Sequence, residues 1–421
     1  MLTMRQKKAV TKELKDRYQR ASKKEKTMML NEFLRLTGYN RCYACQILKK
    51  KEIVLGYLNI AGKRIKYITD KRKIKRKKKK IYDQEVLVAL KEIWKICDYI
   101  CSKRLAPFLS EIIPVLERWG EIKLNLKVRE KLGKISAATI DRLLADTRKR
   151  YRIKGRSTTR PGTLLKKSIP IRTFADWNEK VPGFFEVDLV SHDGGATRGD
   201  FNQSLNFTDI STGWEEMVAV KNKAQVWVFA GIKNIKERLP FSMLGIDSDN
   251  GAEFINAHLI RYCKEHKITF TRSRPYRKND SCFVEQKNWS VIRRAVGYGR
   301  YDTDKELNTL NKLYGYLRLY VNFFQPVRKL IKKERIGSKV IKRYDEAKTP
   351  YRRVLVSTDI EDEVKVKLRK EYDMLNPAEL KRKITKLQNK LLKLNALKQK
   401  VREDLVEKSV EPSSRFEYIS T

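Results

Sequence analysis

Phe184-Phe185-Glu186-Val187-Asp188-Leu189-Val190 is an apolar stretch with the pattern of a strand, and it carries Asp188. A second apolar stretch ends at Asp249-Asn250-Gly251, and Glu285 follows Asp249 with 35 residues in between. A carboxylate in a buried strand is costly without a partner, and three carboxylates at one point repel each other unless cations neutralise them. Because carboxylate oxygens suit Mg²⁺, the trio predicts a site for two such ions, with Mn²⁺ as a substitute.

The residues around the trio alternate between strand and helix patterns. They follow the order of three strands, a helix, a strand, a helix, a strand, a loop and a helix. This order predicts a mixed five-stranded α/β sheet with helices on its faces. The expected strands are 184–191, 204–209, 214–220, 243–246 and 268–271, and the expected helices are one between residues 222 and 240, then 252–266 and 283–296.

This order of elements places the three carboxylates at one edge of the sheet. Asp188 lies in the first strand, Asp249 just past the fourth, and Glu285 early in the helix after the fifth. Because sites in open α/β sheets gather at strand ends, we expect the three to converge. The chain has only three His, and neither of its close Cys pairs (Cys42/Cys45 and Cys97/Cys101) has a His nearby, which disfavours zinc chemistry.

The charge of the chain indicates a polyanionic partner. Its 421 residues carry 95 Lys and Arg against 50 Asp and Glu, a formal net charge of +45, which favours DNA or RNA over a membrane surface. Nine of the ten residues 71–80 are basic, Lys77 and Lys78 among them, and this arm is expected to bind phosphates without sequence preference. No apolar stretch of about 18 residues predicts a membrane span. Residues 1–8 lack an apolar signal core, so a cytoplasmic, nucleoid-associated protein is expected.

Two regions before the sheet have the pattern of a helix-turn-helix. In residues 1–70, two short helical patterns flank Thr37-Gly38-Tyr39-Asn40. In residues 81–150, a helix that starts after Ser136 presents Thr139 and Arg142, which suit a reader of the DNA major groove. An ordinary helical hairpin and a core helix are the respective alternatives.

The remaining segments complete a multidomain α+β protein. We expect a linker at 151–181, the catalytic core at 182–300, helices and a basic region at 301–360, and a helical tail at 361–421. The tail has a 4-3-4-3 apolar repeat that is typical of a coiled-coil seam and predicts self-association, with packing inside the chain as the alternative. The repeat consists of Leu380, Ile384, Leu387, Leu391 and Leu394.

The spacing of Asp188, Asp249 and Glu285 resembles the D,D-35-E pattern of retroviral integrases and bacterial insertion-sequence transposases. The likeness covers residues 183–300, including segments 248–254 and 275–280, and extends to residues 322–326. The transposases are the more similar group, because the viral enzymes carry a zinc module that needs His residues and this chain has none before His192. The resemblance implies an RNase H-like core and a DDE-type DNA transposase.

The resemblance also implies roles for individual residues. Asp188, Asp249 and Glu285 become catalytic metal ligands, and Asn250 and Gly251 shape the turn that presents Asp249. Cleavage at transposon ends frees a 3′-hydroxyl, which then attacks target DNA. The implied partners are the terminal inverted repeats, target DNA and further copies of the chain. Phosphate contacts are expected from basic residues around Glu285, with a solvated basic face as the alternative: Lys278, Lys287, Arg293 and Arg294.

Four other residues compete for roles in the site. Asp247 shares a strand face with Asp249, but the Asp-Asn-Gly context favours Asp249. Asp193 precedes two glycines, which indicates turn chemistry, and Asp209 is expected to be structural. His192 is expected to be structural or to support the site.

Two further functional classes stay open. One is a two-metal DNA nuclease without strand transfer, which would leave nicks but no joined products. The other is a transposase-derived DNA-binding protein without catalysis, whose activity would survive Asp249→Asn or Glu285→Gln.

Overall fold

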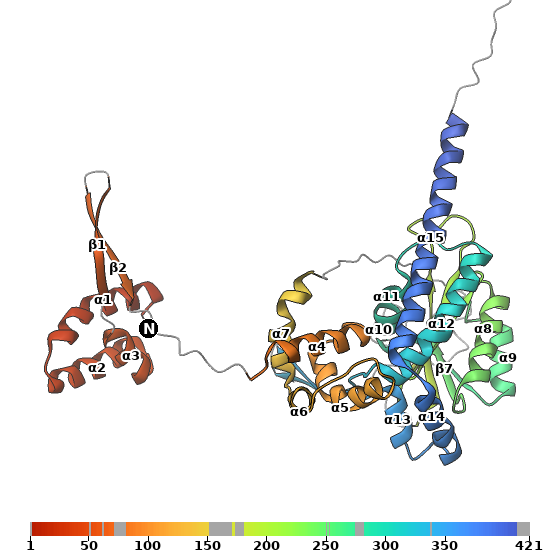
Figure 1. Cartoon of the computed structure of the whole chain (residues 1–421), viewed down its shortest axis with the longest axis horizontal. Coiled ribbons are helices and arrows are strands. Elements are labelled where there is room, and N and C mark those ends of the chain that lie inside the picture. Colours follow the sequence, from red (N-terminus) through yellow and green to blue (C-terminus); the bar gives the residue numbers. More distant parts are fainter. Residues whose placement is uncertain are drawn as a thin grey trace, which may run out of the picture. The chain divides into compact units, whose positions relative to one another are not determined.

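The computed structural model describes residues 2–49, 52–60, 63–70, 81–150, 171–172, 181–249, 251, 253–273, 282–336 and 339–410. They belong to two compact units, residues 1–81 and 82–421 (Figure 1). The basic arm 71–80 with Lys77 and Lys78, most of the expected linker, Asn250 and Lys278 lie outside the described residues.

The first unit contains three helices and a hairpin: α1 (Met4–Arg20), α2 (Lys23–Thr37), α3 (Arg41–Lys49), β1 (Glu52–Ile60) and β2 (Lys63–Asp70). Gly38 ends α2 with a φ of 67°, a conformation that glycine adopts without strain. Tyr18, Phe33 and Leu48 form its small core. The expected helix pair around Gly38 is therefore present, and the hairpin is an element that the sequence analysis did not predict.

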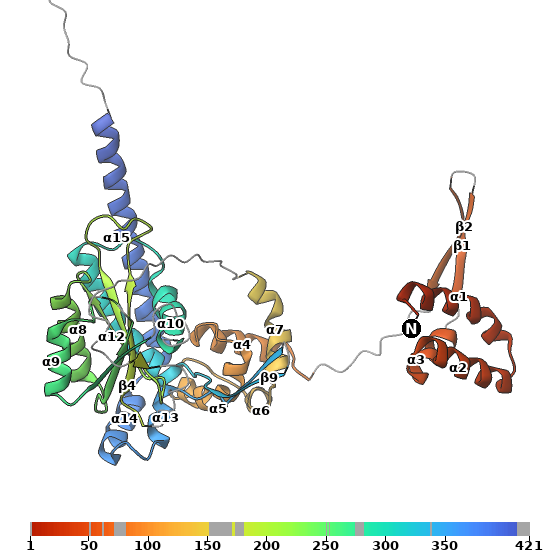
Figure 2. The same ribbon diagram turned by 180° about the vertical axis from the view of Figure 1, so that it is seen from behind.

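The second unit is built on a mixed sheet in the order β3-β8-β7-β4-β5-β6, seen from behind in Figure 2. β5 runs antiparallel to β4 and β6, whereas β4, β7 and β8 are parallel to one another. The five expected strands thus form a sheet consistent with an RNase H-like core. A sixth, two-residue strand joins its edge from the expected linker. The strands are β3 (Ile171–Arg172), β4 (Phe184–Ser191), β5 (Gln203–Asp209), β6 (Glu215–Val220), β7 (Gly245–Ser248) and β8 (Thr269–Ser273).

Helices cover both faces and one edge of this sheet. α8 (Gln225–Arg238) and α9 (Ala257–Glu265) lie on one side, and α10 (Cys282–Lys287) lies on the other (Figures 1 and 2). α10 continues into the π-helical turn η2 (Asn288–Arg293) and then α11 (Arg294–Val296). α9 begins five residues later than the sequence predicted, because Asn256 caps it by accepting a hydrogen bond from the Leu259 N–H.

The edge strand β6 is closed by α12 (Asp304–Phe324). Asn311 accepts from the Ala219 N–H (2.8 Å) and donates to the Ala219 carbonyl (3.0 Å). Asn322 makes the same pair of bonds to Glu215, both at 2.8 Å. The two amides replace the peptide groups of a neighbouring strand, so this edge offers fewer sites for further strand pairing.

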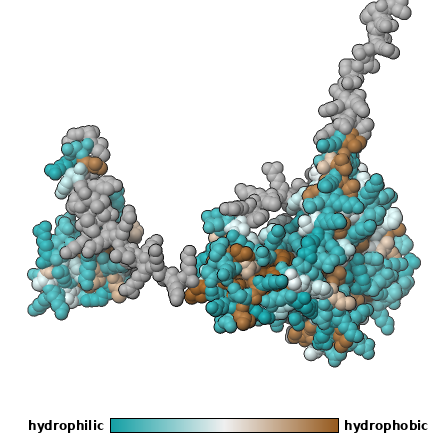
Figure 3. All heavy atoms as spheres, viewed as in Figure 1, coloured by the Kyte–Doolittle hydropathy of each residue, from teal (hydrophilic) through white to brown (hydrophobic). Residues whose placement is uncertain are grey.

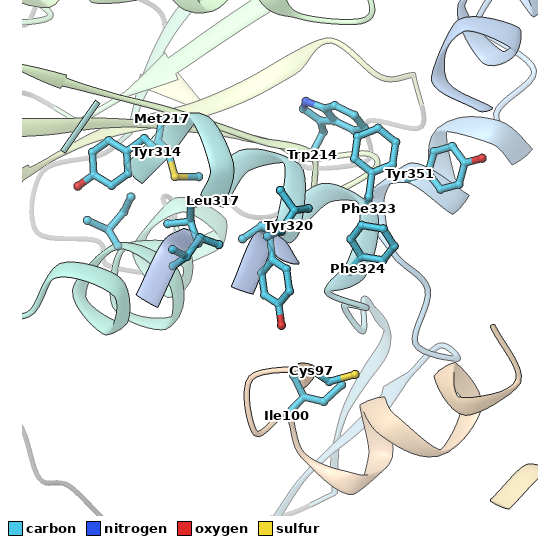
Figure 4. Packing of buried hydrophobic residues seen from close by; sticks show 14 of the residues in the cluster. Cys97, Ile100, Trp214, Met217, Tyr314, Leu317, Tyr320, Phe323, Phe324 and Tyr351 are labelled. Atoms are coloured by element: carbon cyan, nitrogen blue, oxygen red, sulfur yellow. The ribbon is translucent and has the colours of Figure 1, made fainter. Parts of the chain in front are cut away.

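The helices before the sheet belong to the same unit: α4 (Gln84–Ile96), α5 (Ser102–Arg118), α6 (Leu126–Gly133) and α7 (Ala137–Arg150). Gln325, after α12, donates to the Cys97 carbonyl (3.1 Å), and Tyr320 donates to the Ile96 carbonyl. Figure 4 shows the aromatic residues of α12 packed between Trp214, which directly precedes strand β6, and this helical region. Residues 81–150 therefore share one hydrophobic core with the sheet instead of forming a separate domain.

The C-terminal part adds β9 (Leu330–Ile336), β10 (Lys339–Tyr344), α13 (Pro350–Val356), α14 (Asp362–Met374) and α15 (Pro377–Val410). The apolar repeat of α15 packs on α12, with Ile384 and Leu391 almost fully buried. The seam expected to mediate self-association is thus used inside the chain. Figure 3 shows a largely hydrophilic face, with hydrophobic side chains gathered over α4–α7. Among the described helices, none has the length and apolar character needed to cross a membrane.

Candidate active site

The parallel pairing of β4 and β7 brings Asp188 and Asp249 to one end of the sheet. Val187 is paired with Ser248, and the two aspartates are the next residue on each chain. The Gly251 N–H donates to Asp249 Oδ1 (2.9 Å) and so fixes the turn that carries this carboxylate. Glu285 lies in the first turn of α10, which contacts β4 and β5. A strand, a turn and a helix thus supply the three carboxylates.

The three carboxylates influence one another electrostatically. Burial raises the pKa of Asp188 to about 8, and the charges of Asp249 and Glu285 act in the same direction. Hydrogen bonds from the Leu189 N–H and from Asn288 oppose this rise. Burial also raises the pKa of Asp249. The surroundings therefore only partly stabilise the ionised forms of Asp188 and Asp249.

A fourth carboxylate holds the helix that bears Glu285. Glu186 is fully buried and lies two residues before Asp188, on the same face of β4. Its Oε2 accepts hydrogen bonds from the N–H groups of Phe283 (2.7 Å) and Val284 (2.8 Å). Such N–H groups in a first helical turn have no acceptor within the helix, so Glu186 ties the start of α10 to β4. Its alternation with Asp188 in the strand was a signal that the sequence analysis did not use.

A polar network beneath the site joins Asp188 to a buried ion pair. Asn288 donates to Asp188 Oδ2 (2.7 Å), and Asn206 donates to Asn288 Oδ1 (2.9 Å). Burial raises the pKa of the neighbouring Glu215, and Lys287 and Asn206 act to lower it. Glu215 Oε2 accepts a hydrogen bond from Lys287 Nζ (2.6 Å). Lys287 is 11% exposed and Glu215 is fully buried. The expected phosphate contact does not fit Lys287, because its ammonium fixes α10 to β6 from inside.

The competing aspartates have structural partners. Asp247 is buried and accepts from Thr271 Oγ1 (2.5 Å). Asp209 accepts from Thr212 N–H and Oγ1, both at 2.6 Å. Asp193 accepts from the Gly195 N–H (2.9 Å), as its turn context predicted.

His192 is buried close to the sheet. Its Nε2 is 2.7 Å from Ser204 Oγ, and that hydroxyl is in turn hydrogen-bonded to Tyr314. Burial lowers the pKa of His192 to about 3, so the ring is neutral at ordinary pH. These contacts fit the expected structural role.

No family model matches the chain. The uncharacterized protein y4rM of Sinorhizobium fredii (strain NBRC 101917 / NGR234) is 39% identical over 329 residues, which cover 78% of this chain and 89% of y4rM. The chain belongs to the y4rM family.

Solved structures similar to this y4rM-family chain include the catalytic core of BIV integrase, which is 18% identical, with coverage of 40% of this chain and 91% of that chain and a TM-score of 0.28. The simian T-cell lymphotropic virus intasome in complex with the PP2A regulatory subunit B56 gamma is 13% identical, covering 50% and 69%, with a TM-score of 0.30. The dimeric form of the HTLV-2 integrase catalytic core in complex with magnesium is 14% identical, covering 35% and 91%, with a TM-score of 0.26. The strand order and register of the sheet, and not these alignments, define the fold of the y4rM-family core.

The donor set of the site fits a hard divalent cation. Within the described residues, no three His, Cys, Asp or Glu side chains are already gathered as a metal-binding cluster. Asp188, Asp249 and Glu285 nevertheless offer carboxylate oxygens, the ligands that Mg²⁺ prefers. Burial, followed by the charges of Asp249 and Glu285, raises the pKa of Asp188, and a bound cation would counteract both effects by favouring the ionised carboxylate. By the chemistry of their oxygens, these three residues are the ones that could hold such an ion.

The other basic residues expected at DNA differ in their surroundings. Arg293 donates to the Ser191 carbonyl (2.7 Å) and is directed into the fold. Arg294 forms an ion pair with Asp98 (3.2 Å). Arg142 is exposed on α7 and bonds only to its own helix among the described residues, so it remains a candidate for phosphate contact.

Proposed function

We propose that this chain is a DDE-type DNA transposase that cuts transposon ends and transfers the freed 3′-hydroxyl to target DNA. The observation that carries the proposal is the charge coupling of Asp188, Asp249 and Glu285 at one end of the central strands. The same residues have the D,D-35-E spacing, and the sheet has the strand order of an RNase H-like core.

The reaction consists of two phosphoryl transfers. Water attacks phosphorus at the transposon end, the bond to the 3′ oxygen breaks, and that oxygen leaves as a hydroxyl. This hydroxyl then attacks a target phosphorus and displaces the 3′ oxygen of the target strand, without a covalent bond to the protein. Bound Mg²⁺ supplies Lewis-acid stabilisation of the charge on the phosphoryl oxygens.

The residues of the chain orient the groups that hold the cation. Glu186 fixes the start of α10, and Lys287 fixes its end through Glu215. Asn288 donates a hydrogen bond to Asp188 Oδ2 and so holds this carboxylate in one orientation. Support of this kind commonly changes metal affinity or activity by about 10–100-fold when it is removed.

We assign DNA binding to the first unit because of its helix pair, and the net charge of the chain supports this assignment. Helices α2 and α3 meet at Gly38 as a helix-turn-helix does, and the formal net charge of the chain is +45. We propose the terminal inverted repeats and target DNA as partners, with more than one copy of the chain acting on paired ends.

The test uses duplex DNA that carries the sequences flanking the reading frame, a supercoiled target plasmid and Mg²⁺. Wild-type protein is expected to produce a 3′-recessed cut and a joined product, and Asp249→Asn neither. Asp304→Asn, which changes an exposed acid on α12, is the control and should leave both products unchanged. Cuts without joined products would replace the transposase by a two-metal nuclease, and DNA binding by wild type with neither product would leave a DNA-binding protein only. Equal cutting by Asp249→Asn would remove Asp249 from the active site.

A further inference from the structure

The helix beside the candidate active site carries an exposed tryptophan. Trp289 is 68% exposed, whereas Trp119 and Trp227 are 40% and 43% exposed, and Trp94 and Trp214 are buried. Within the described residues, its ring stacks on no other aromatic ring and on no cation. An indole ring at the surface lacks much of the burial that stabilises tryptophan inside a fold. Its exposure therefore indicates contact with a partner outside the chain.

The position of Trp289 is tied to the three carboxylates. It follows Glu285 by four residues, and residues four apart along a helix are neighbours on one face, about 5–6 Å apart at their Cβ atoms. The preceding residue, Asn288, donates to Asp188 Oδ2 at 2.7 Å. The backbone of η2 is therefore anchored to the candidate active site immediately before Trp289.

The basic residues of the same helix do not compete for this face. Lys287 is buried against Glu215, and Arg293 donates to the Ser191 carbonyl. Along α10 and η2 from Glu285 onward, the exposed residues are Glu285, Gln286 and Trp289. Arg294 of α11 is also exposed, and its guanidinium is paired with Asp98 (3.2 Å). A DNA strand at this surface would meet an aromatic ring instead of an ammonium group.

We propose that Trp289 stacks on an unpaired nucleobase of the DNA end next to the phosphate that is cut. This inference rests on the proposed function and adds a base-binding position to it. Stacking suits any base, because every base has a π face, and it offsets part of the free energy of unpairing the end. An opened end would also bring the phosphate within reach of the carboxylates.

The test measures binding of the full-length protein to three versions of one duplex from the flank of the reading frame, without divalent metal. The first has a mismatched, frayed end with 2-aminopurine as its unpaired base, the second is fully paired, and the third has an abasic position there. Wild-type protein is expected to quench the 2-aminopurine fluorescence and to prefer the frayed duplex. Trp289→Ala should lose the quenching and bind the frayed duplex about tenfold more weakly.

Two matched variants separate stacking from a general loss of structure. Trp289→Phe keeps an aromatic ring and should retain quenching and most of the affinity. Trp227→Ala removes a tryptophan that is 43% exposed on α8, across the sheet from α10, and should bind all three duplexes as wild type does. With the abasic duplex, Trp289→Ala and wild type should bind equally.

Three results would overturn the inference. They are unchanged quenching by Trp289→Ala, an equal loss on the frayed and abasic duplexes, and a wild-type protein that does not distinguish these duplexes. Cleavage by wild-type protein is measured in parallel with Mg²⁺. Absent cleavage removes the proposed function, whereas normal cleavage and quenching by Trp289→Ala remove only the stacking role.

Discussion

Two acidic clusters in the second unit have opposite electrostatics. Around Asp188, burial and the charges of Asp249 and Glu285 raise the pKa. Around Asp302, burial acts against ionisation, but hydrogen bonds from Lys398, Arg402 and Arg300 lower the pKa. The two aspartates are both poorly exposed, so the difference arises from what the chain places beside them.

The comparison distinguishes acids that build the fold from acids that await a ligand. Asp302 and Glu306 accept hydrogen bonds from Lys398, which comes from α15 and completes the packing of that helix on α12. The raised pKa of Asp188 does not result from a shortage of basic side chains, because the chain has 95 Lys and Arg. Groups with strongly perturbed pKa values that the fold leaves uncompensated are candidates for function.

The largest expected effect is the loss of catalysis when the uncompensated cluster is neutralised. Asp188→Asn should reduce end cleavage by more than the about 10–100-fold that a residue supporting a metal ligand typically contributes. Its fold should persist, because the variant removes a repelled charge and keeps an acceptor for the Leu189 N–H. Gel analysis of cleaved ends measures the first effect and thermal unfolding the second.

The same substitution in the compensated cluster sharpens the contrast. Asp302→Asn should leave cleavage close to wild type and lower the thermal midpoint, because it removes a charge that Lys398 and Arg402 stabilise. A catalytic defect in Asp302→Asn as large as that in Asp188→Asn would erase the distinction between the clusters.

The second expected effect concerns the support of the uncompensated cluster. Glu186→Ala removes the acceptor of two N–H groups of α10 and should lower cleavage about 10–100-fold while raising the Mg²⁺ concentration required. Glu186→Gln retains an oxygen that can accept both bonds and should recover most of the activity. The readout is cleavage rate as a function of Mg²⁺ concentration. Equal defects in the two variants would mean that the charge of Glu186, and not its hydrogen bonds, matters.

The sequence could predict the sheet better than the supports of its site. β4 and β5 lie within one residue of the expected strands, because local alternation and burial decide them. The interior role of Lys287 could not be read locally, since its partner Glu215 is 72 residues away. The π-helical turn at Asn288 has no periodic signature that separates it from an α-helix, so the contact of Asn288 with Asp188 was also missed.

The third expected effect is on stability in the compensated cluster. Lys398→Met removes hydrogen bonds to Asp302 and Glu306, and should lower the free energy of unfolding by about 1.5–3 kcal/mol, the usual contribution of hydrogen bonds to charged groups. Lys383→Met is the control on the same helix, because its ion pair with Glu379 is about half exposed and should matter by less than about 1 kcal/mol. Urea unfolding measures both, and equal midpoints for the two variants would contradict the prediction.

The smallest expected effect is a dependence of stability on pH that differs in sign between the clusters. The pKa of Asp188 is raised to about 8 in the folded chain, so the folded state holds its proton where the unfolded state has lost it. Stability from this group is present at low pH and falls as pH rises through about 8, by at most about 1.4 kcal/mol per pH unit and by less for a half-buried carboxyl. Asp302 has a lowered pKa, so its contribution is present at neutral pH and is lost only under acid conditions. His192, with a pKa of about 3, likewise destabilises the fold only as pH falls below about 6.5.

Between about pH 7 and pH 8.5, Asp188 is therefore the group of these three that changes stability. Urea unfolding in EDTA should show wild-type stability declining over this window by about 1 kcal/mol, with the decline absent in Asp188→Asn. Asp302→Asn should be less stable than wild type throughout and should decline in parallel with it. Added Mg²⁺ should suppress the decline in wild type, since a bound cation favours the ionised carboxylates. A decline of equal slope in Asp188→Asn would show that the raised pKa belongs to another group, and the two clusters would then no longer differ in the way that assigns function to one of them.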